Sequence, residues 1–214
     1  MRWSGLALSP SLRFPTMNAK AQNRSSIRII GVDPGLACTG FGVIETTLNG
    51  TARYIGSGTI HSPQGQSLAK RLQKIYHGLL REMERYSPQL MGVEKPFLAR
   101  NVKSAMLLGQ ARGLAILAAA EAEVPVQEFS PLEIKQAVVG YGRAGKAQVE
   151  AMIRSIFQIP DPLSPHAADA LAVAVCFGHV LPWQISLAAI SGSGFQPSKA
   201  RVDSSPTEIL EGHQ

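Results

Sequence analysis

Three short β-rich runs open the apolar part of this chain, and the connections between them constrain the fold more than any other feature. The runs span residues 29–33, 40–46 and 53–60. Only a few residues separate the first two runs, and connections this short join antiparallel neighbours, because a parallel crossover needs about a dozen residues or more. We therefore expect the fold to begin near Ile29 with an antiparallel sheet of three strands.

Helical and strand patterns alternate after these runs. The sequence predicts strands at residues 90–94 and 124–129, and helices at 68–83, at 101–122, after the capping pattern Ser130-Pro131-Leu132-Glu133, at 146–157 and at 166–180. This order indicates a mixed α/β sheet whose first three strands are antiparallel and whose faces carry flanking helices. No Gly-x-Gly-x-x-Gly follows the first strand, so a doubly wound dinucleotide-binding fold is excluded.

The net charge of +6 is distributed unevenly along the chain. Residues 1–28 carry five basic side chains and no acidic one, residues 29–180 carry 14 basic and 12 acidic, and residues 181–214 carry two basic and three acidic. The predicted folded domain, residues 29–180, is therefore only mildly basic. Affinity for a nucleic acid would have to come from the local placement of Lys and Arg, or from the basic tail.

Both ends of the chain are rich in Ser and Pro and lack a sustained apolar period, so we expect residues 1–28 and 181–214 to be disordered tails. The first tail is a flexible segment, a translation start assigned too early with Met17 as the true start, or an organellar transit peptide. The apolar stretches fall short of the ~20 residues that a bilayer span needs, so no membrane is expected. Cys38 and Cys176 have no partner spacing, which is typical of reduced thiols in a cytoplasmic protein.

Acidic side chains in apolar surroundings need an explanation, because burying an unpaired carboxylate is costly. Asp33 and Glu94 each end an apolar strand, and Asp169 lies within the apolar final helix. His166 precedes Asp169 by three residues, so the two share one helical face. These four side chains could converge on one patch, where divalent cations would relieve the repulsion between like charges.

Each of the four also has an explanation without catalysis. Asp33 before Pro34-Gly35 fits simple turn chemistry, and Glu94 before Lys95 fits a surface ion pair. Asp169 could be a satisfied polar group of the core, and His166 a helix N-terminal residue with no further role. Their common position at the ends of apolar elements argues against four separate explanations.

Six short motifs occur in order between residues 29 and 180. They are Ile30-Gly31-Val32-Asp33-Pro34-Gly35, Thr39-Gly40-Phe41-Gly42-Val43-Ile44, Val93-Glu94-Lys95-Pro96-Phe97, Leu108-Gly109-Gln110-Ala111-Arg112-Gly113, Lys135-Gln136-Ala137-Val138-Val139-Gly140 and Ala167-Ala168-Asp169-Ala170-Leu171-Ala172. The order and spacing of these motifs resemble those of the RuvC-type Holliday-junction resolvases. The resemblance implies a ribonuclease-H-like fold and a homodimer that cuts two opposed strands of a four-way DNA junction in recombination and repair. It also implies a role beside the RuvA–RuvB branch-migration motor.

Carried over by motif, the resemblance implies that Asp33, Glu94 and Asp169 are metal ligands. The fourth ligand position falls on His166, where many family members have aspartate and some have histidine. Two Mg²⁺ ions per site are implied, with Mn²⁺ also supporting activity. One ion would activate a water for in-line attack on the phosphodiester, and the other would stabilise the leaving 3′ oxygen.

The resemblance also implies DNA-binding residues. Phe97, in a loop after a strand, resembles the family's base-stacking aromatic, with a core side chain as the alternative explanation. Lys135 and Lys146 resemble basic residues near the scissile phosphate. Further candidate phosphate contacts are Arg100, Lys103 and Arg143, for which ordinary solvated surface charges are the alternative.

Three other functions share part of this pattern. Actin-like ATPases and sugar kinases open with a similar strand and Asp-Gly loop, but they need two such domains, and residues 29–180 supply one. A catalytically inactive junction-binding protein is the second alternative, with His166 as the mark of a decayed site. A ribonuclease H proper fits less well, because the Phe97 loop and the later lysine-bearing segments fit junction cutting better.

Overall fold

The computed structural model describes residues 26–95 and 102–190 of the chain. Five strands form one sheet in the order β3-β2-β1-β4-β5. The antiparallel part consists of β1 (Ser26–Asp33), β2 (Cys38–Thr47) and β3 (Ala52–His61). The parallel part adds β4 (Leu90–Glu94) beside β1, and β5 (Val126–Phe129) beside β4. The predicted mixed sheet with an antiparallel beginning is confirmed.

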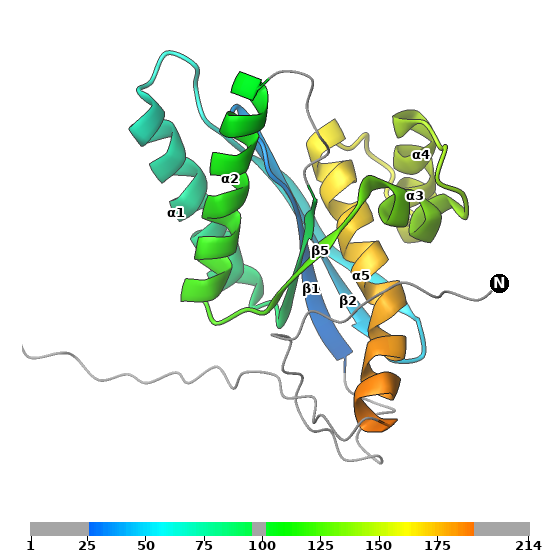
Figure 1. Cartoon of the computed structure of the whole chain (residues 1–214). Coiled ribbons are helices and arrows are strands. Elements are labelled where there is room, and N and C mark those ends of the chain that lie inside the picture. Colours follow the sequence, from blue (N-terminus) through cyan, green and yellow to red (C-terminus); the bar gives the residue numbers. More distant parts are fainter. Residues whose placement is uncertain (1–25, 96–101, 191–214) are drawn as a thin grey trace, which may run out of the picture.

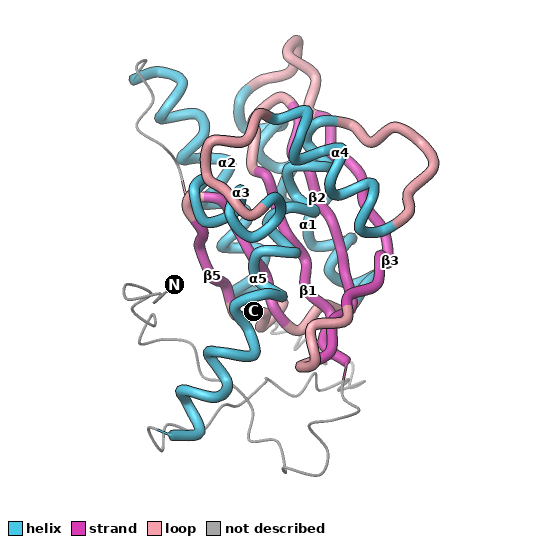
Figure 2. The backbone as a smooth tube through the Cα atoms, turned by 90° about the vertical axis from the view of Figure 1, so that its right-hand side faces the viewer, coloured by secondary structure: helices cyan, strands magenta, loops and turns pink. Residues whose placement is uncertain are grey.

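Helices cover both faces of the sheet (Figure 1). One face carries α1 (Leu68–Tyr86) and α2 (Val102–Glu121). The other face carries α5 (Pro165–Ile190), and α3 (Pro131–Val139) and α4 (Lys146–Phe157) pack against α5. Figure 2, turned by 90°, shows α5 crossing the strands on this face.

The central strand β1 supplies side chains to two apolar cores, one on each face of the sheet. Ile29 belongs to the core beneath α5, whereas Ile30 and Val32 belong to the core beneath α1 and α2. All three side chains are fully buried, and burial of each contributes about 1.5–3 kcal/mol. The strand is therefore fixed from both sides up to Asp33, its last residue.

Local sequence signals set several helix boundaries as predicted. The Ser130 hydroxyl accepts a hydrogen bond from the Glu133 backbone N–H, and the Glu133 carboxylate accepts one from the Ser130 N–H at 2.7 Å, which forms a capping box at the start of α3. At the end of α1, Ser87 adopts the left-handed conformation immediately before Pro88.

Two predicted domain boundaries differ from the structure. β1 begins at Ser26, because residues 26–28 pair with β2, so the described fold starts before Ile29. At the other end, α5 runs through Pro182 to Ile190, and the predicted boundary of the tail at residue 181 does not hold. Leu181 is buried, and the Gln184 side chain donates a buried hydrogen bond of 3.1 Å to the side-chain oxygen of Gln127 on β5. This packing holds the last turns of α5 in place despite the proline.

The helix α5 is long and apolar enough, by length and composition, to cross a membrane over residues Pro165–Ser186. About two thirds of its most apolar window is buried inside the fold, however, against the sheet and against α3 and α4. Its apolar character is therefore explained by its place in the core.

Candidate active site at the ends of β1 and β4

Three glycines allow α5 to lie directly on the sheet. A Cβ atom at Gly40 would overlap the backbone carbonyl of His166, one at Gly31 would overlap the carbonyl of Ala170, and one at Gly42 would overlap Leu171. Only glycine permits this close approach of helix and strand backbones. These glycines were not predicted to position the site, although their spacing along β1 and β2 leaves one face of the sheet without side chains at these positions.

This close approach brings His166 against Asp33. Asp33 and Gly40 are directly paired residues of β1 and β2, and the first turn of α5 rests on Gly40. Nδ1 of His166 lies 2.7 Å from Oδ2 of Asp33, within hydrogen-bond distance. Ser164 fixes the start of the helix, because its hydroxyl accepts a hydrogen bond of 3.2 Å from the Ala167 N–H.

Glu94 and Asp169 complete the acidic group. The parallel strands β1 and β4 are in register at Val32 and Val93, so the next residues, Asp33 and Glu94, emerge side by side at the same edge of the sheet. Asp169 lies one helical turn after His166 on α5, on the same face. The amino group of Lys146, at the start of α4, donates a hydrogen bond of 2.8 Å to Oδ2 of Asp169.

The electrostatic coupling within the group is strong. Burial, followed by the negative charges of Asp33 and Asp169, raises the pKa of Glu94 to about 7, while Lys146 and Lys135 oppose the shift. Burial also raises the pKa of Asp33, and the Asp169 charge adds to this, although the hydrogen bond with His166 acts in the other direction. The hydrogen bond to Asp169 raises the pKa of Lys146. Burial and the neighbouring carboxylates therefore both disfavour the ionised forms of Glu94 and Asp33.

Divalent cations fit this group by the chemistry of its donors. Carboxylate oxygens suit Mg²⁺ and Mn²⁺, and a neutral imidazole suits Mn²⁺ better than Mg²⁺. Within the described part of the chain, no three His, Cys, Asp or Glu side chains already form a compact metal-binding group. Lys146 instead contacts Asp169, and His166 contacts Asp33. A cation bound through these same atoms would replace the two contacts.

The structure describes the side chains of three of the six predicted DNA-binding residues. Lys135 on α3 and Lys146 on α4 lie close enough for their charges to act on Glu94. Arg143 is exposed in the loop that joins these two helices. Phe97, Arg100 and the side chain of Lys103 lie outside the described residues.

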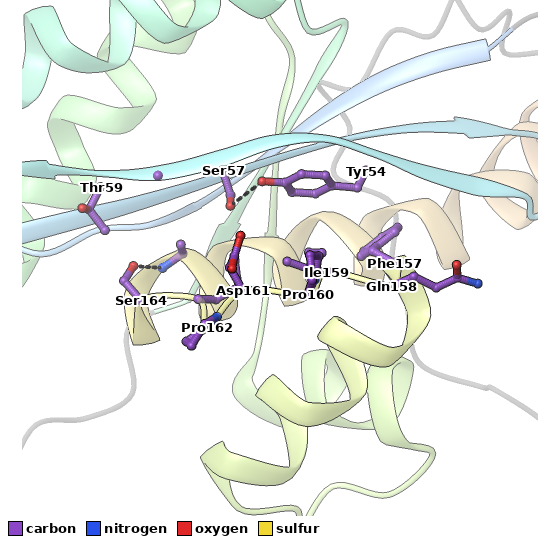
Figure 3. Close-up of a pocket in the computed structure, with 13 residues that line it drawn as sticks. Tyr54, Ser57, Thr59, Phe157, Gln158, Ile159, Pro160, Asp161, Pro162 and Ser164 are labelled. Carbon is purple, nitrogen blue, oxygen red and sulfur yellow. Dashed lines mark hydrogen bonds between the residues drawn. The ribbon is translucent and has the colours of Figure 1, made fainter.

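A cavity of about 540 Å³ lies beside this site but does not contain it. It is formed by Tyr54, Ser57 and Thr59 on the edge strand β3 and by residues 157–164, which lead into α5 (Figure 3). None of Asp33, Glu94, His166 and Asp169 lines it. The candidate active site at the sheet edge is therefore distinct from this cavity.

Comparisons with known proteins identify the family. The family model described as crossover junction endodeoxyribonuclease RuvC matches residues 29–177. The curated RuvC protein of Geobacter sulfurreducens is 48% identical over 150 residues, which cover 70% of this chain and 91% of that protein. The RuvC protein of a Shewanella species (strain ANA-3) is 47% identical over 164 residues, covering 77% of this chain and 92% of that protein.

Solved structures agree with this assignment. RuvC of Thermus thermophilus in complex with a Holliday junction substrate is 31% identical, covers 74% of this chain and 96% of that chain, and gives a TM-score of 0.70. The yeast mitochondrial Holliday junction resolvase shares the fold, with a TM-score of 0.56 at 12% identity over 85% of each chain. The predicted resemblance and the ribonuclease-H-like fold are thus confirmed, and this chain belongs to the RuvC family of crossover junction endodeoxyribonucleases.

Proposed function

We propose that this protein resolves Holliday junctions by hydrolysing one phosphodiester bond in each of two opposed strands, at a site formed by Asp33, Glu94, His166 and Asp169. The observation that carries the proposal is the convergence of β1, β4 and α5 at this site. Asp33 and Glu94 emerge side by side from paired strands, and α5 brings His166 to 2.7 Å from Asp33. All four residues lie within the matched span 29–177.

Membership of this nuclease family implies dependence on divalent metal ions. We assign the binding of two Mg²⁺ ions, replaceable by Mn²⁺, to the three carboxylates and the His166 ring. Support comes from the raised pKa of Glu94, about 7, to which burial contributes most and the negative charges of Asp33 and Asp169 contribute next, because a bound cation would offset both effects. When bound, the cations supply the positive charge that activates a water and stabilises the leaving 3′ oxygen.

The chain's own basic residues have separate tasks in this proposal. Lys146 holds Asp169 in the absence of substrate, and its side chain is 81% exposed, so that it can turn toward an incoming phosphate. Lys135 lies on α3, before the α3–α4 loop, and its positive charge also lowers the pKa of Glu94. Both lysines then offset phosphate charge next to the acidic group, which otherwise repels the DNA backbone.

Paired cutting requires two copies of the site, and the exposed face of α2 is suited to form a homodimer. Five of its exposed residues recur at spacings of three and four, so they form one stripe along the helix: Val102, Met106, Gly109, Gly113 and Leu117. A Cβ atom at Gly109 or Gly113 would meet nothing within 4 Å, so a second helix can approach closely there. A stripe of this kind, paired with its own copy about a two-fold axis, buries apolar surface on both chains.

The setting of the reaction follows from the same assignment. Cys38 and Cys176 are free thiols, which fits a reducing cytoplasm. There the homodimer would act on junctions that a RuvA–RuvB branch-migration complex moves.

The proposal is tested by offering a mobile four-way junction, a linear duplex of the same sequence and an RNA–DNA hybrid to the wild-type protein and to Asp33→Asn. Cutting of the junction alone by the wild type, and loss of cutting in the variant, is the expected result. Preferential cutting of the hybrid would instead indicate a ribonuclease H. Tight junction binding without cutting in either Mg²⁺ or Mn²⁺ would indicate an inactive binding protein, and ATP turnover without DNA cutting an actin-like ATPase.

A further inference from the structure

Two aromatic side chains of the described residues are exposed, Tyr141 by 48% and Trp183 by 74%. Trp183 lies near the end of α5, and the active-site residue His166 lies at its beginning, so ~25 Å of helix separate them. Tyr141 lies instead in the loop that joins α3 to α4. Of the two exposed rings, Tyr141 therefore lies in the loop that leads to Lys146, which contacts Asp169 of the candidate active site.

The loop that carries Tyr141 is fixed at both ends and in the middle. The Gly140 N–H donates a hydrogen bond of 3.0 Å to the Gln136 carbonyl, and the Gly145 N–H donates one of 2.8 Å to the Gln148 side chain. Between these ends, Gly142 lies so close to Leu132 that a Cβ atom would overlap it. The loop thus folds back along α3, and the glycines on either side of Tyr141 have no side chains to cover its ring.

The same loop connects the two lysines of the active site. Lys135 precedes it on α3 and Lys146 follows it on α4, and both charges act on Glu94. Arg143 is exposed within the loop. Tyr141 is thus an exposed aromatic ring on a held loop, five residues before the lysine whose amino group lies 2.8 Å from Asp169 of the candidate active site.

We propose that Tyr141 stacks on a nucleobase of the strand being cut, next to the scissile phosphate, while the flanking cations contact the neighbouring phosphates. Cations alone suffice to bind phosphates, but an exposed ring among them adds a face on which a base can stack. A base that is unpaired or loosened near a junction presents such a face. This contact rests on the proposed function, and it adds a second aromatic, from a different element, to the predicted role of Phe97.

Stacking is tested directly with 2-aminopurine, whose fluorescence falls when it stacks. The probe is placed in turn at the positions within about three nucleotides of the branch point, and junctions are bound by the non-cutting Asp33→Asn protein. At one position, binding should change the fluorescence, Tyr141→Phe should preserve the change, and Tyr141→Ala should abolish it. Trp183→Ala is the matched control, because it removes the other exposed ring and should leave the signal unchanged.

Kinetics separate stacking from a structural role. Loss of one stacked base should raise the KM of Tyr141→Ala for the junction by about tenfold and leave kcat within about twofold, because the contact is made equally before and during the reaction. Tyr141→Phe should match the wild type. An unchanged KM in Tyr141→Ala overturns the proposal, and so does equal impairment of Tyr141→Phe, which would indicate a contact through the hydroxyl group instead.

Failure of this inference is distinguishable from failure of the proposed function. If the wild type cuts junctions and Tyr141→Ala gives the wild-type KM and fluorescence change, the stacking contact is refuted and the nuclease remains. If the wild type cuts nothing, but the fluorescence change still depends on the ring at position 141, the stacking contact stands and the nuclease is refuted. Thermal unfolding of Tyr141→Ala should match that of the wild type, since the side chain is exposed.

Discussion

The ammonium group of Lys146 lies 2.8 Å from Oδ2 of Asp169, so a lysine of α4 holds a carboxylate of α5 that we assign to metal binding. A lysine cation and a metal cation cannot both make this contact fully. A metal ion bound through this oxygen would therefore have to displace the ammonium group of Lys146.

Replacing Lys146 by Met should separate metal binding from catalysis. Without the competing ammonium group, Mn²⁺ should bind the free protein more tightly in calorimetry, because Asp169 is then available. Cutting of junctions should nevertheless fall by about tenfold or more, since a charged contact to phosphate is lost. Lys135→Met is the matched control, because no hydrogen bond to a candidate ligand is lost with it. Weaker binding of Mn²⁺ by Lys146→Met would contradict the competition.

Glu94→Gln should stabilise the metal-free protein at high pH. Because the folded protein raises the pKa of Glu94 to about 7, the unfolded chain releases this proton first as the pH rises above the ordinary value of 4.5. The ionised carboxylate thus costs stability progressively between these values, and fully above about pH 7. After allowance for solvent, we expect a gain of about 1–2 kcal/mol at pH 8 in urea unfolding with a chelator, and little change at pH 4.5.

Two comparisons sharpen this measurement. Adding Mg²⁺ at pH 8 should stabilise the wild type more than Glu94→Gln, because a ligand has been removed. Glu45→Gln should behave oppositely, since hydrogen bonds from Arg53 and Arg28 lower the pKa of Glu45, and its contribution is present at neutral pH and lost on acidification. Equal unfolding free energies of Glu94→Gln and the wild type at pH 8 would show that the ionised Glu94 carboxylate does not destabilise the folded protein, and would contradict this prediction.

His166→Asp should shift the metal preference of cutting from Mn²⁺ toward Mg²⁺. His166→Asp replaces a neutral nitrogen donor by a charged oxygen donor, and Mg²⁺ favours all-oxygen surroundings. The ratio of the cutting rate in Mn²⁺ to that in Mg²⁺ should therefore fall several-fold. His179→Asp makes the same change on an exposed position of α5 away from the site and should leave the ratio unchanged. An unaltered ratio in His166→Asp would exclude His166 from metal binding.

Gly40→Ala tests whether the close approach of α5 to β2 positions the active site. The added methyl group would overlap the His166 carbonyl, which should lower the unfolding free energy by about 1–3 kcal/mol and move His166 away from Asp33. We expect cutting at a temperature where the variant remains folded to fall by about tenfold. Gly65→Ala, at an exposed glycine with open space around it, should change neither quantity.

The sequence predicted the order of elements well, because each element follows a clear period of apolar residues. The end of α5 was mispredicted for a physical reason: Pro182 is a helix-ending signal, whereas the packing of Leu181 and the bond between Gln184 and Gln127 are tertiary contacts that no local pattern contains.

The candidate site was predictable in part. The apolar strands ending in Asp33 and Glu94 marked two carboxylates, and the three-residue spacing marked His166 and Asp169 as neighbours. The contact of Lys146 with Asp169 joins two helices, and its distance depends on how α4 packs on α5. Such distances follow from tertiary packing and are not encoded in spacing along the chain.

Metal-dependent paired cutting of four-way junctions is tested on a supercoiled plasmid that extrudes an inverted repeat as a cruciform. With Mg²⁺ or Mn²⁺, the wild type should give linear DNA, because both opposed strands are cut within one complex. Met106→Glu, which places a charge on the proposed α2 interface, should give mainly nicked circles, and Asp33→Asn should give neither product. Equal cutting of a plasmid without the repeat, or an intact cruciform plasmid with both metals, would contradict the claim.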